Sequence, residues 1–313
     1  MIVTVTLNAA IDVTYRVPRL RPHTTHRVSE AAERPGGKGL NVARVLAALG
    51  HEAVATGFAG GASGDRLRAY LTGIDGVTDA LVPTSGSTRR TVGVVDESGG
   101  DTTMFNEPGP TITSQEWAAF LGTYRKFLDG GAARAVALCG SLPPGLPVGC
   151  YAELVRDARA AGVPVLLDTS GEPLRRGLAA RPDLVKPNAA ELTGLTGATE
   201  PMRAARDARR RGARAVAASL GPDGMLALAE NGTVWTARPP APLPGNPAGA
   251  GDSAVAALLS GLVEGLDWPR RLARAVALSA ATVAAPVAGE FDRGVYEDLL
   301  GRVEVISEGD SRQ

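Results

Sequence analysis

Short apolar runs that alternate with segments of helix length constrain the fold of this chain more than any other feature. The runs are typical of buried strands and span residues 2–8, 53–59, 135–140, 163–168, 184–188 and 215–221. Amphipathic segments lie between several of them, and we expect helices at 41–49, 115–127, 149–161 and 202–211. Strands without a polar face indicate a mostly parallel sheet with helices on both sides. The sequence therefore predicts a doubly wound α/β domain that binds ligands beyond the carboxyl ends of its strands.

Two stretches alternate polar and apolar residues instead, which is typical of strands with one exposed face. They cover residues 11–34 and 88–107, and the second contains the turn sequence DESGGD. We interpret them as a small β-sheet inserted into an α/β domain made of residues 1–10, 35–87 and 108–313. Such a sheet needs a surface to cover, so we expect a lid over the active site or a contact with a second subunit. The tail at 303–313 is predicted to be loose.

Composition excludes several classes of partner. Acidic and basic residues balance at 33 each, so there is no electrostatic reason to expect nucleic acid or an anionic membrane as a partner. The 2 cysteines, Cys139 and Cys150, are too few for a disulfide scaffold. The first residues lack the pattern of a signal peptide, and no uninterrupted apolar run reaches the length of a membrane span. We expect a cytoplasmic protein.

The segment GNPAGAGDSAVAALLSGL at 245–262 is the most informative for chemistry. Gly249, Ala250 and Gly251 are small residues at the start of an apolar helix, where free N–H groups and the helix dipole form an anion site. Asp252 follows at once. An acid in this place can simply stabilise its own helix, but that does not explain the small residues before it. Together they suit phosphoryl transfer, with Asp252 as the base for an attacking hydroxyl.

A second glycine-rich turn precedes a helix in RPGGKGLNVARVLAALG at 34–50. Gly37 lies in its flexible part, Lys38 can meet a phosphate, and Asn41 can bind hydroxyl groups. Such turns are common, so this segment is weak when taken alone. It contains neither the G-x-x-x-x-G-K-[ST] loop of one large nucleotide-binding class nor the G-x-G-x-x-G dinucleotide fingerprint.

Nine motifs occur in the order in which one known family has them. They are TLNAAID, GGKGLNVA, GSTRR, FNEPGP, GSLPPG, DTSGEPL, LVKPNAAEL, SLGPDG and GAGD. With them the chain resembles, nearly from end to end, the PfkB family of carbohydrate kinases, which has the ribokinase-like fold. TLNAAID, GGKGLNVA and FNEPGP are most similar to the branch that acts on phosphosugars, which includes 1-phosphofructokinase, the minor 6-phosphofructokinase and tagatose-6-phosphate kinase.

The resemblance implies a role for each matching residue. Asp252 matches the general base, and residues 249–251 match the anion hole. The positions that match substrate-binding residues are Asp12, Gly37, Lys38, Asn41 and either Arg89 or Arg90. The positions that match ATP-binding residues are Lys186, Asn188, Ser219, Gly221 and Gly224. Asn188 and Glu191 match a pair that holds Mg²⁺, mostly through water, although by sequence alone they read as a helix cap with its capping-box acid.

Three departures from the family pattern stand out. Residues 246–248 are Asn-Pro-Ala where many members have Asp-Thr and bind a monovalent cation, so such a cation is a further candidate cofactor. Thr91 stands where the phosphosugar kinases often have Asn, and residues 280–292 also differ. These departures bear on the cation and on the sugar, and they leave the machinery of phosphoryl transfer intact.

The sequence thus predicts an ATP- and Mg²⁺-dependent kinase, with fructose 1-phosphate as the preferred substrate and fructose 1,6-bisphosphate as the product. Fructose 6-phosphate and tagatose 6-phosphate are close alternatives. A kinase of an unphosphorylated sugar or nucleoside and an inactive sugar-binding regulator stay open. A dehydrogenase is a more distant alternative, since the dinucleotide fingerprint is missing. The resemblance also implies a homodimer formed through the lid.

Overall fold

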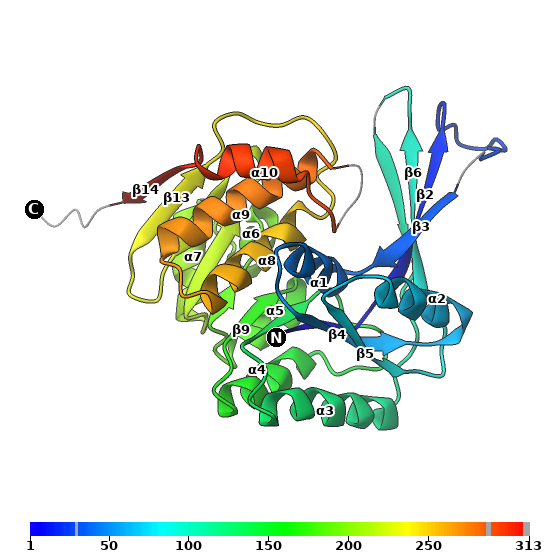
Figure 1. The fold of residues 1–313 in the computed structure, drawn as a ribbon, viewed down its shortest axis with the longest axis horizontal. Helices are drawn as coiled ribbons and strands as arrows, with labels where there is room; N and C mark the ends of the chain where they lie inside the picture. Colours follow the sequence, from blue (N-terminus) through cyan, green and yellow to red (C-terminus); the bar gives the residue numbers. More distant parts are fainter. Residues whose placement is uncertain (29–30, 100, 286–288, 309–313) are drawn as a thin grey trace, which may run out of the picture.

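The computed structural model describes residues 1–28, 31–99, 101–285 and 289–308, and it contains one large sheet and one small sheet. The large sheet has ten strands in the order β14-β13-β12-β11-β10-β9-β8-β1-β4-β5 (Figure 1). From β11 to β5 all neighbours run parallel, whereas β12, β13 and β14 are antiparallel. The strands are β1 Ile2–Thr6, β4 Ala53–Ala59, β5 Val77–Pro83, β8 Ala135–Cys139, β9 Val165–Asp168, β10 Leu184–Val185, β11 Ala215–Ser219, β12 Met225–Leu228, β13 Val234–Arg238 and β14 Glu304–Glu308.

Helices cover both faces of the large sheet, because its strands are apolar on both sides. One apolar core packs against α3 Ser114–Asp129, α4 Cys150–Ala160, α5 Gly171–Leu178, α6 Ala189–Thr196 and α7 Pro201–Arg210. The core on the other face packs against α1 Lys38–Ala48, α2 Gly61–Thr72, α8 Ala250–Val263 and α9 Trp268–Val283. Helix α10 Arg293–Leu300 lies against α9 (Figure 1). In β8, Val136 and Leu138 face the first core and Ala137 the second, so successive side chains alternate between the two layers.

The small sheet extends away from this body in the order β3-β2-β6-β7 (Figure 1). Its strands are β2 Ala10–Val17, β3 Ala31–Gly36, β6 Arg89–Asp96 and β7 Thr102–Asn106. The predicted fold class, a doubly wound α/β domain with a separate small sheet, is therefore confirmed. The four strands come from the two alternating stretches of the sequence.

All six predicted core strands and all four predicted helices are present, with ends shifted by a few residues. One expectation was wrong: residues 304–308 of the supposedly loose tail form β14, which pairs with the outer edge of β13. An edge strand of this kind needs only one buried side, so a polar sequence such as EVISE can occupy it. Of the unusual 280–292 segment, residues 286–288 lie outside the described part of the chain.

The strand order places a crevice at the centre of the sheet. From β1 the chain winds outward through β4 to β5, and it then returns to β8 on the other side of β1 and winds through β9 to β11. The crossover direction changes between β1 and β8, and ligands of such sheets bind outside the carboxyl ends of strands at this point. No helix in the described residues is long and apolar enough to cross a bilayer.

Candidate active site

The amino end of α8 offers unused hydrogen-bond donors to the crevice. Gly249, at the start of the helix, has a φ of 84°, a left-handed conformation that favours glycine. No side chain caps this helix, and no described residue accepts a hydrogen bond from the amides of Gly249, Gly251 or Asp252. The amide of Ala250 donates to the Pro247 carbonyl at 3.2 Å. Three of the four amides around the predicted anion hole are therefore open to a ligand.

Asp252 is not a cap for its own helix. The residue as a whole is 7% exposed. Oδ2 of its carboxylate accepts a hydrogen bond of 2.8 Å from Nδ2 of Asn41 in α1. Burial raises the pKa of Asp252 to about 7, and the nearby Asp168 carboxylate contributes to the rise. The Asn41 hydrogen bond and the charges of Lys38 and Lys186 oppose it. A carboxylate with a pKa near neutrality is suited to act as a general base at physiological pH.

Two of the chain's three lysines meet at a buried carboxylate beside Asp252. Asp168 is the last residue of β9, and its side chain is fully buried. Nζ of Lys38 lies 3.2 Å from Asp168 Oδ2, and Nζ of Lys186 lies 3.4 Å from Oδ1. A methyl group built on Gly251 would lie 3.4 Å from Nζ of Lys186, so the ammonium group faces the open amides of α8. Two cations thus stand where an anion would meet these amides.

Lys38 stays charged despite its surroundings. Burial would lower the pKa of Lys38, but the carboxylates of Asp168, Asp252 and Glu191 outweigh it and raise that pKa above its usual value. Nζ of Lys38 is 4.0 Å from Glu191 Oε1. Its side chain is 39% exposed, whereas Lys186 is buried. Lys38 is therefore the more accessible of the two lysines in the crevice.

The lid carries the predicted sugar-binding residues. The carboxylate of Asp12 on β2 has a raised pKa because it is buried, although Arg89 and a hydrogen bond from Thr91 oppose the rise. A side chain at Gly36 on β3 would place its Cβ 2.1 Å from Asp12 Oδ1, so only glycine leaves room for this carboxylate. Asp12 therefore lies against Arg89 at the root of the lid.

The structure separates the two candidate arginines. Arg89 donates to the Asn8 carbonyl and to Thr91 Oγ1, each at 3.2 Å, and it lines an open hollow of ≈ 610 Å³. Arg90 points to the other face of β6, where it pairs with Glu107 at 3.0 Å and is 61% exposed. Successive side chains of a strand face opposite ways, so only Arg89 faces Asp12.

The predicted nucleotide side lies next to the lysines. Asn188 caps α6, and it exchanges hydrogen bonds with Glu191 that are each 2.8 Å long. Ser219 forms an isolated bridge with Asn188 at the end of β11. Gly221 has a φ of 63°, and a Cβ there would meet nothing within 4 Å. Gly224 is needed for a structural reason, because a Cβ would lie 2.0 Å from the Ala237 carbonyl oxygen.

A magnesium ion fits this site only as part of a nucleotide complex. No three His, Cys, Asp or Glu side chains of the described residues form a cluster that could hold a metal. The capping box uses Oδ1 of Asn188 and Oε2 of Glu191, which leaves Oε1 of Glu191 near Lys38. Mg²⁺ commonly keeps several waters and binds one or two carboxylates together with substrate phosphates. The donors that are present match this mode.

Buried polar atoms without a hydrogen-bond partner gather in this crevice. In the described residues these atoms are Oγ1 of Thr6, Oδ1 of Asn8, Oδ1 of Asn41 and both carboxylate oxygens of Asp168, although the Asp168 oxygens do form the ion pairs with Lys38 and Lys186. Such atoms are rare in folded proteins and usually indicate a missing ligand or water. All of them belong to residues at or beside the carboxyl ends of β1 and β9 or at the start of α1. The crevice is therefore built for a polar ligand.

Sequence reasoning missed three residues of the site. Asp168 holds both lysines, and Asn8 donates to Ser141 Oγ at 3.1 Å beside Arg89. Asp168 ends an apolar run, and an acid at the carboxyl end of a buried parallel strand was a usable signal. Asn8 and Ser141 lie in the motifs TLNAAID and GSLPPG, but their meeting depends on β1 and β8 being neighbours.

Comparisons with known proteins agree with this geometry. The sequence pattern described as "pfkB family carbohydrate kinase" matches residues 2–291. The 1-phosphofructokinase of Rhodobacter capsulatus is 41% identical over 286 residues, which are 89% of this chain and 90% of that protein. Phosphofructokinase-2 from Escherichia coli, solved with substrates and products, superposes with a TM-score of 0.86 at 30% identity and covers 96% of this chain and 98% of its own.

Other structures of that Escherichia coli protein contain fructose-6-phosphate, contain potassium, or show a tetrameric inhibited form. The ribokinase of Arabidopsis thaliana shares the fold, with a TM-score of 0.73 at 24% identity over 96% of this chain and 98% of its own. The predicted fold and the predicted carbohydrate-kinase activity are thereby confirmed, and kinases of this family use ATP. The chain belongs to the pfkB family of carbohydrate kinases.

Proposed function

We propose that this kinase transfers the γ-phosphoryl group of ATP to fructose 1-phosphate and forms fructose 1,6-bisphosphate. The observation that carries the proposal is the crevice at the start of α8, where Asp252, three open amides and two lysines surround one place. The 41% identity to a 1-phosphofructokinase over most of both chains supports the choice of sugar phosphate. The predicted cytoplasmic location agrees with ATP as the phosphoryl donor.

In the proposed reaction Asp252 takes the proton of the sugar hydroxyl as its oxygen forms a bond to the γ-phosphorus. The bond between that phosphorus and the bridging oxygen of ATP breaks, and ADP leaves with the bond's electrons. The amides of α8 and the ammonium groups of Lys38 and Lys186 stabilise the charge on the transferring group. Their donors are fixed before the substrate arrives, so little reorganisation is needed during the reaction.

The same proposal assigns the predicted binding residues. Asp12 and Asn41 bind sugar hydroxyls, Gly37 shapes the turn beside them, and Arg89 binds the phosphate that the substrate already carries. Through water, Asn188 and Glu191 would hold Mg²⁺, which would supply positive charge beside the nucleotide phosphates. Lys186, Ser219, Gly221 and Gly224 form the nucleotide side. The small sheet, with residues 11–34 and 88–107, closes as a lid and excludes water.

Fructose 6-phosphate is the second candidate substrate. The Escherichia coli relative whose structure contains fructose-6-phosphate is 31% identical to this chain. A panel of phosphosugars and free sugars, assayed by ADP release, separates these candidates and tagatose 6-phosphate. Release of ADP with none of them, together with tight sugar binding, would favour an inactive regulator. A monovalent cation stays a prediction that potassium dependence in the same assay can test.

We further propose a homodimer through the lid. β7 is an edge strand of the small sheet, and Met104 and Phe105 on it are 53% and 58% exposed. Large apolar side chains on an exposed sheet edge are typical of a surface that a partner covers. A second lid packed on this edge would bury both side chains.

Replacement of the base tests the central assignment. We expect Asp252→Asn to lower kcat by on the order of 10²–10⁴, since general-base catalysis usually contributes this much. The melting temperature should stay close to that of the wild type, because an amide keeps the shape of the side chain. Asp298→Asn, at an exposed pair on α10, is the matched control. Near-normal turnover of Asp252→Asn would show that another group takes the proton.

The pH dependence follows from the raised pKa of Asp252. Only the deprotonated carboxylate accepts a proton, so kcat/KM should rise with pH. It should reach half of its plateau at a pH of about 7 and stay constant at higher pH. Asn41→Ala removes a hydrogen bond that lowers this pKa, and the midpoint should move to higher pH. Asn231→Ala, far from the site, should leave it in place. An unmoved midpoint in Asn41→Ala would separate the observed titration from Asp252.

Arg89 and Arg90 provide a matched pair for phosphate binding. Arg89→Ala should raise KM for fructose 1-phosphate roughly 10- to 100-fold, the effect of losing a hydrogen bond between charged groups. Arg89→Ala should raise KM for an unphosphorylated sugar much less. Arg90→Ala should change both values little, because Arg90 pairs with Glu107 on the other face of β6. Equal effects of the two substitutions, or equal effects on both sugars, would contradict the assignment.

Sedimentation at equilibrium tests the dimer. The wild type should have twice the mass of one chain, and Phe105→Glu should shift it toward the monomer because a buried charge disfavours the contact. Ile306→Glu is the control, since Ile306 is also 50% exposed but lies on β14 at the edge of the large sheet. A wild type that sediments as a monomer, or a Phe105→Glu variant that stays dimeric, would exclude this interface.

A further inference from the structure

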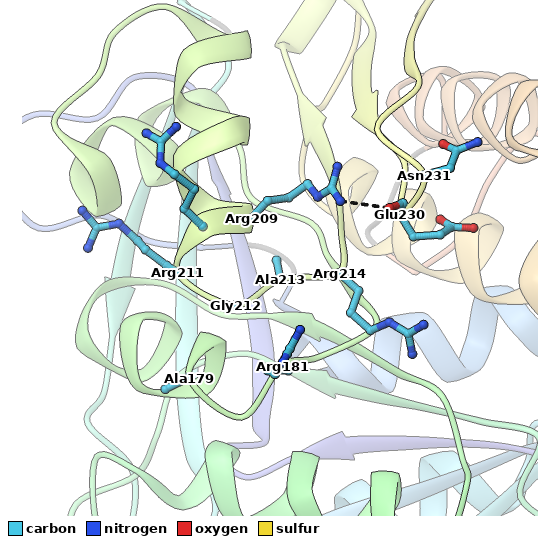
Figure 2. A pocket seen from close by; sticks show the side chains of 10 residues that line it. Ala179, Arg181, Arg209, Arg211, Gly212, Ala213, Arg214, Glu230 and Asn231 are labelled. Atoms are coloured by element: carbon cyan, nitrogen blue, oxygen red, sulfur yellow. Dashed lines mark hydrogen bonds between the residues drawn. The ribbon is translucent and has the colours of Figure 1, made fainter.

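An arginine-lined hollow of ≈ 720 Å³ lies at the amino ends of the parallel strands, whereas the catalytic crevice lies at their carboxyl ends. Arg181 precedes β10 and Arg214 precedes β11, so both lie at the amino ends of strands whose carboxyl ends lead to Lys186 and Ser219. Arg209 lies in the last turn of α7. Arg181, Arg209 and Arg214 all line the hollow, and Figure 2 shows the side chain of Arg209 extending to the turn at Glu230. No role in the kinase reaction involves this hollow.

Two residues beside the hollow have unusual backbone conformations. Gly212 has a φ of 137°, and a Cβ there would lie 2.0 Å from the Leu178 carbonyl oxygen, so the turn after α7 packs directly on the end of α5. Arg181 has a φ of 63°, in the left-handed region that glycine or asparagine would occupy at lower cost. A bulky side chain in this conformation is uncommon and is a reason to look for a function.

Most of the cations near the hollow are partly neutralised, but two are not. Arg214 pairs with Asp183 at 3.0 Å, and Arg210 and Arg211 pair with Asp207 at 2.9 and 2.6 Å. Arg209 instead donates to a neutral carbonyl, that of Glu230, at 2.9 Å. The described residues contain no hydrogen-bond acceptor or carboxylate partner for the side chain of Arg181. Two guanidinium groups therefore face the same space with unused donors.

The one acid that lines the hollow is already engaged. The carboxylate of Glu230 accepts a hydrogen bond of 3.0 Å from the indole nitrogen of Trp268. Burial would raise the pKa of Glu230, but hydrogen bonds to its carboxylate and the charges of Arg271 and Arg214 keep it lower than usual. Glu230 thus stays ionised at the rim and is turned toward α9, and it does not neutralise Arg181 or Arg209.

A simpler explanation covers only part of this cluster. Basic residues at the carboxyl end of a helix stabilise it through the helix dipole, which accounts for Arg209, Arg210 and Arg211 at the end of α7. It does not account for Arg181 and Arg214, which come from two other loops and reach the same space. Convergence of cations from three separate segments is a property of the tertiary structure.

We propose that this hollow is a second anion site, which binds a small metabolite carrying two or more phosphoryl groups. Planar guanidinium groups bind phosphate oxygens in pairs and do so better than ammonium groups. The volume is in the range of small-molecule sites. Nucleic acid fits less well, because the chain has no net charge and Asp183 and Asp207 flank the hollow on its rim. The inference goes beyond the proposed kinase reaction and does not depend on its sugar.

Inorganic pyrophosphate is the probe, titrated into the full-length protein by calorimetry at constant ionic strength. The hollow variant combines Arg181→Asn, which suits the left-handed backbone, with Arg209→Gln. The control combines Arg16→Gln and Arg302→Gln, which remove the same charge from exposed places elsewhere. We expect the hollow variant to lose one class of binding sites, with affinity reduced at least about tenfold, since each lost contact is charge-assisted. The control should keep that class.

Protection from arginine modification locates the site independently of the kinase crevice. Pyrophosphate should slow the reaction of phenylglyoxal with Arg181 and Arg209, read peptide by peptide by mass spectrometry, and leave Arg302 unaffected. Turnover without added pyrophosphate should be equal in wild type and hollow variant, which separates this test from the proposed kinase function. Absence of protection, or equal affinity in both double variants, would overturn the proposal. So would tight binding of a short DNA oligonucleotide at these arginines without pyrophosphate binding.

Discussion

The hydrogen bond between Asn41 and Asp252 is the contact on which the arrangement of the crevice depends. It joins the first turns of α1 and α8, which are far apart in the chain, and holds a carboxylate inside the protein without neutralising it. Asp168 opposes that charge from the end of β9 while it also gathers two lysines. The result is a basic carboxylate beside a strongly cationic place, within a few residues of open helix amides.

The sheet topology explains why the fold stays stable with buried carboxylates at this site. Asp168 and Asp252 lie at the ends of β9 and α8, whose other residues are mostly apolar and buried. The cost of holding Asp168 and Asp252 in a dry environment is offset by two large cores, one on each face of the sheet. Among the described residues, the lid adds only Ile11 and Val13 of β2 to the buried residues of the second core.

The carboxyl ends and the amino ends of the parallel strands carry charge in different ways. At the carboxyl edge the cations are lysines that share a buried acid, and helix amides face them. At the amino ends of the strands the cations are arginines at the end of α7 and in the loops before β10 and β11, and most of them pair with acids near the surface. β10 and β11 connect the loops of the arginine hollow, which precede these strands, to Lys186 and Ser219 at their other ends.

Sequence by itself determined the core strands, the glycine-rich turn at 249–251 that begins α8, and the family, because these features depend on local spacing and on motifs that keep their order. It also supplied both candidate arginines, but the choice between Arg89 and Arg90 required the orientation of β6 relative to Asp12. Asp168, Asn8 and Ser141 lie together in the site because β1, β8 and β9 are neighbours in the sheet. β14 formed from a polar tail because β13 offered it an open edge. These outcomes rest on contacts between residues distant in the chain, and a single sequence does not record such contacts.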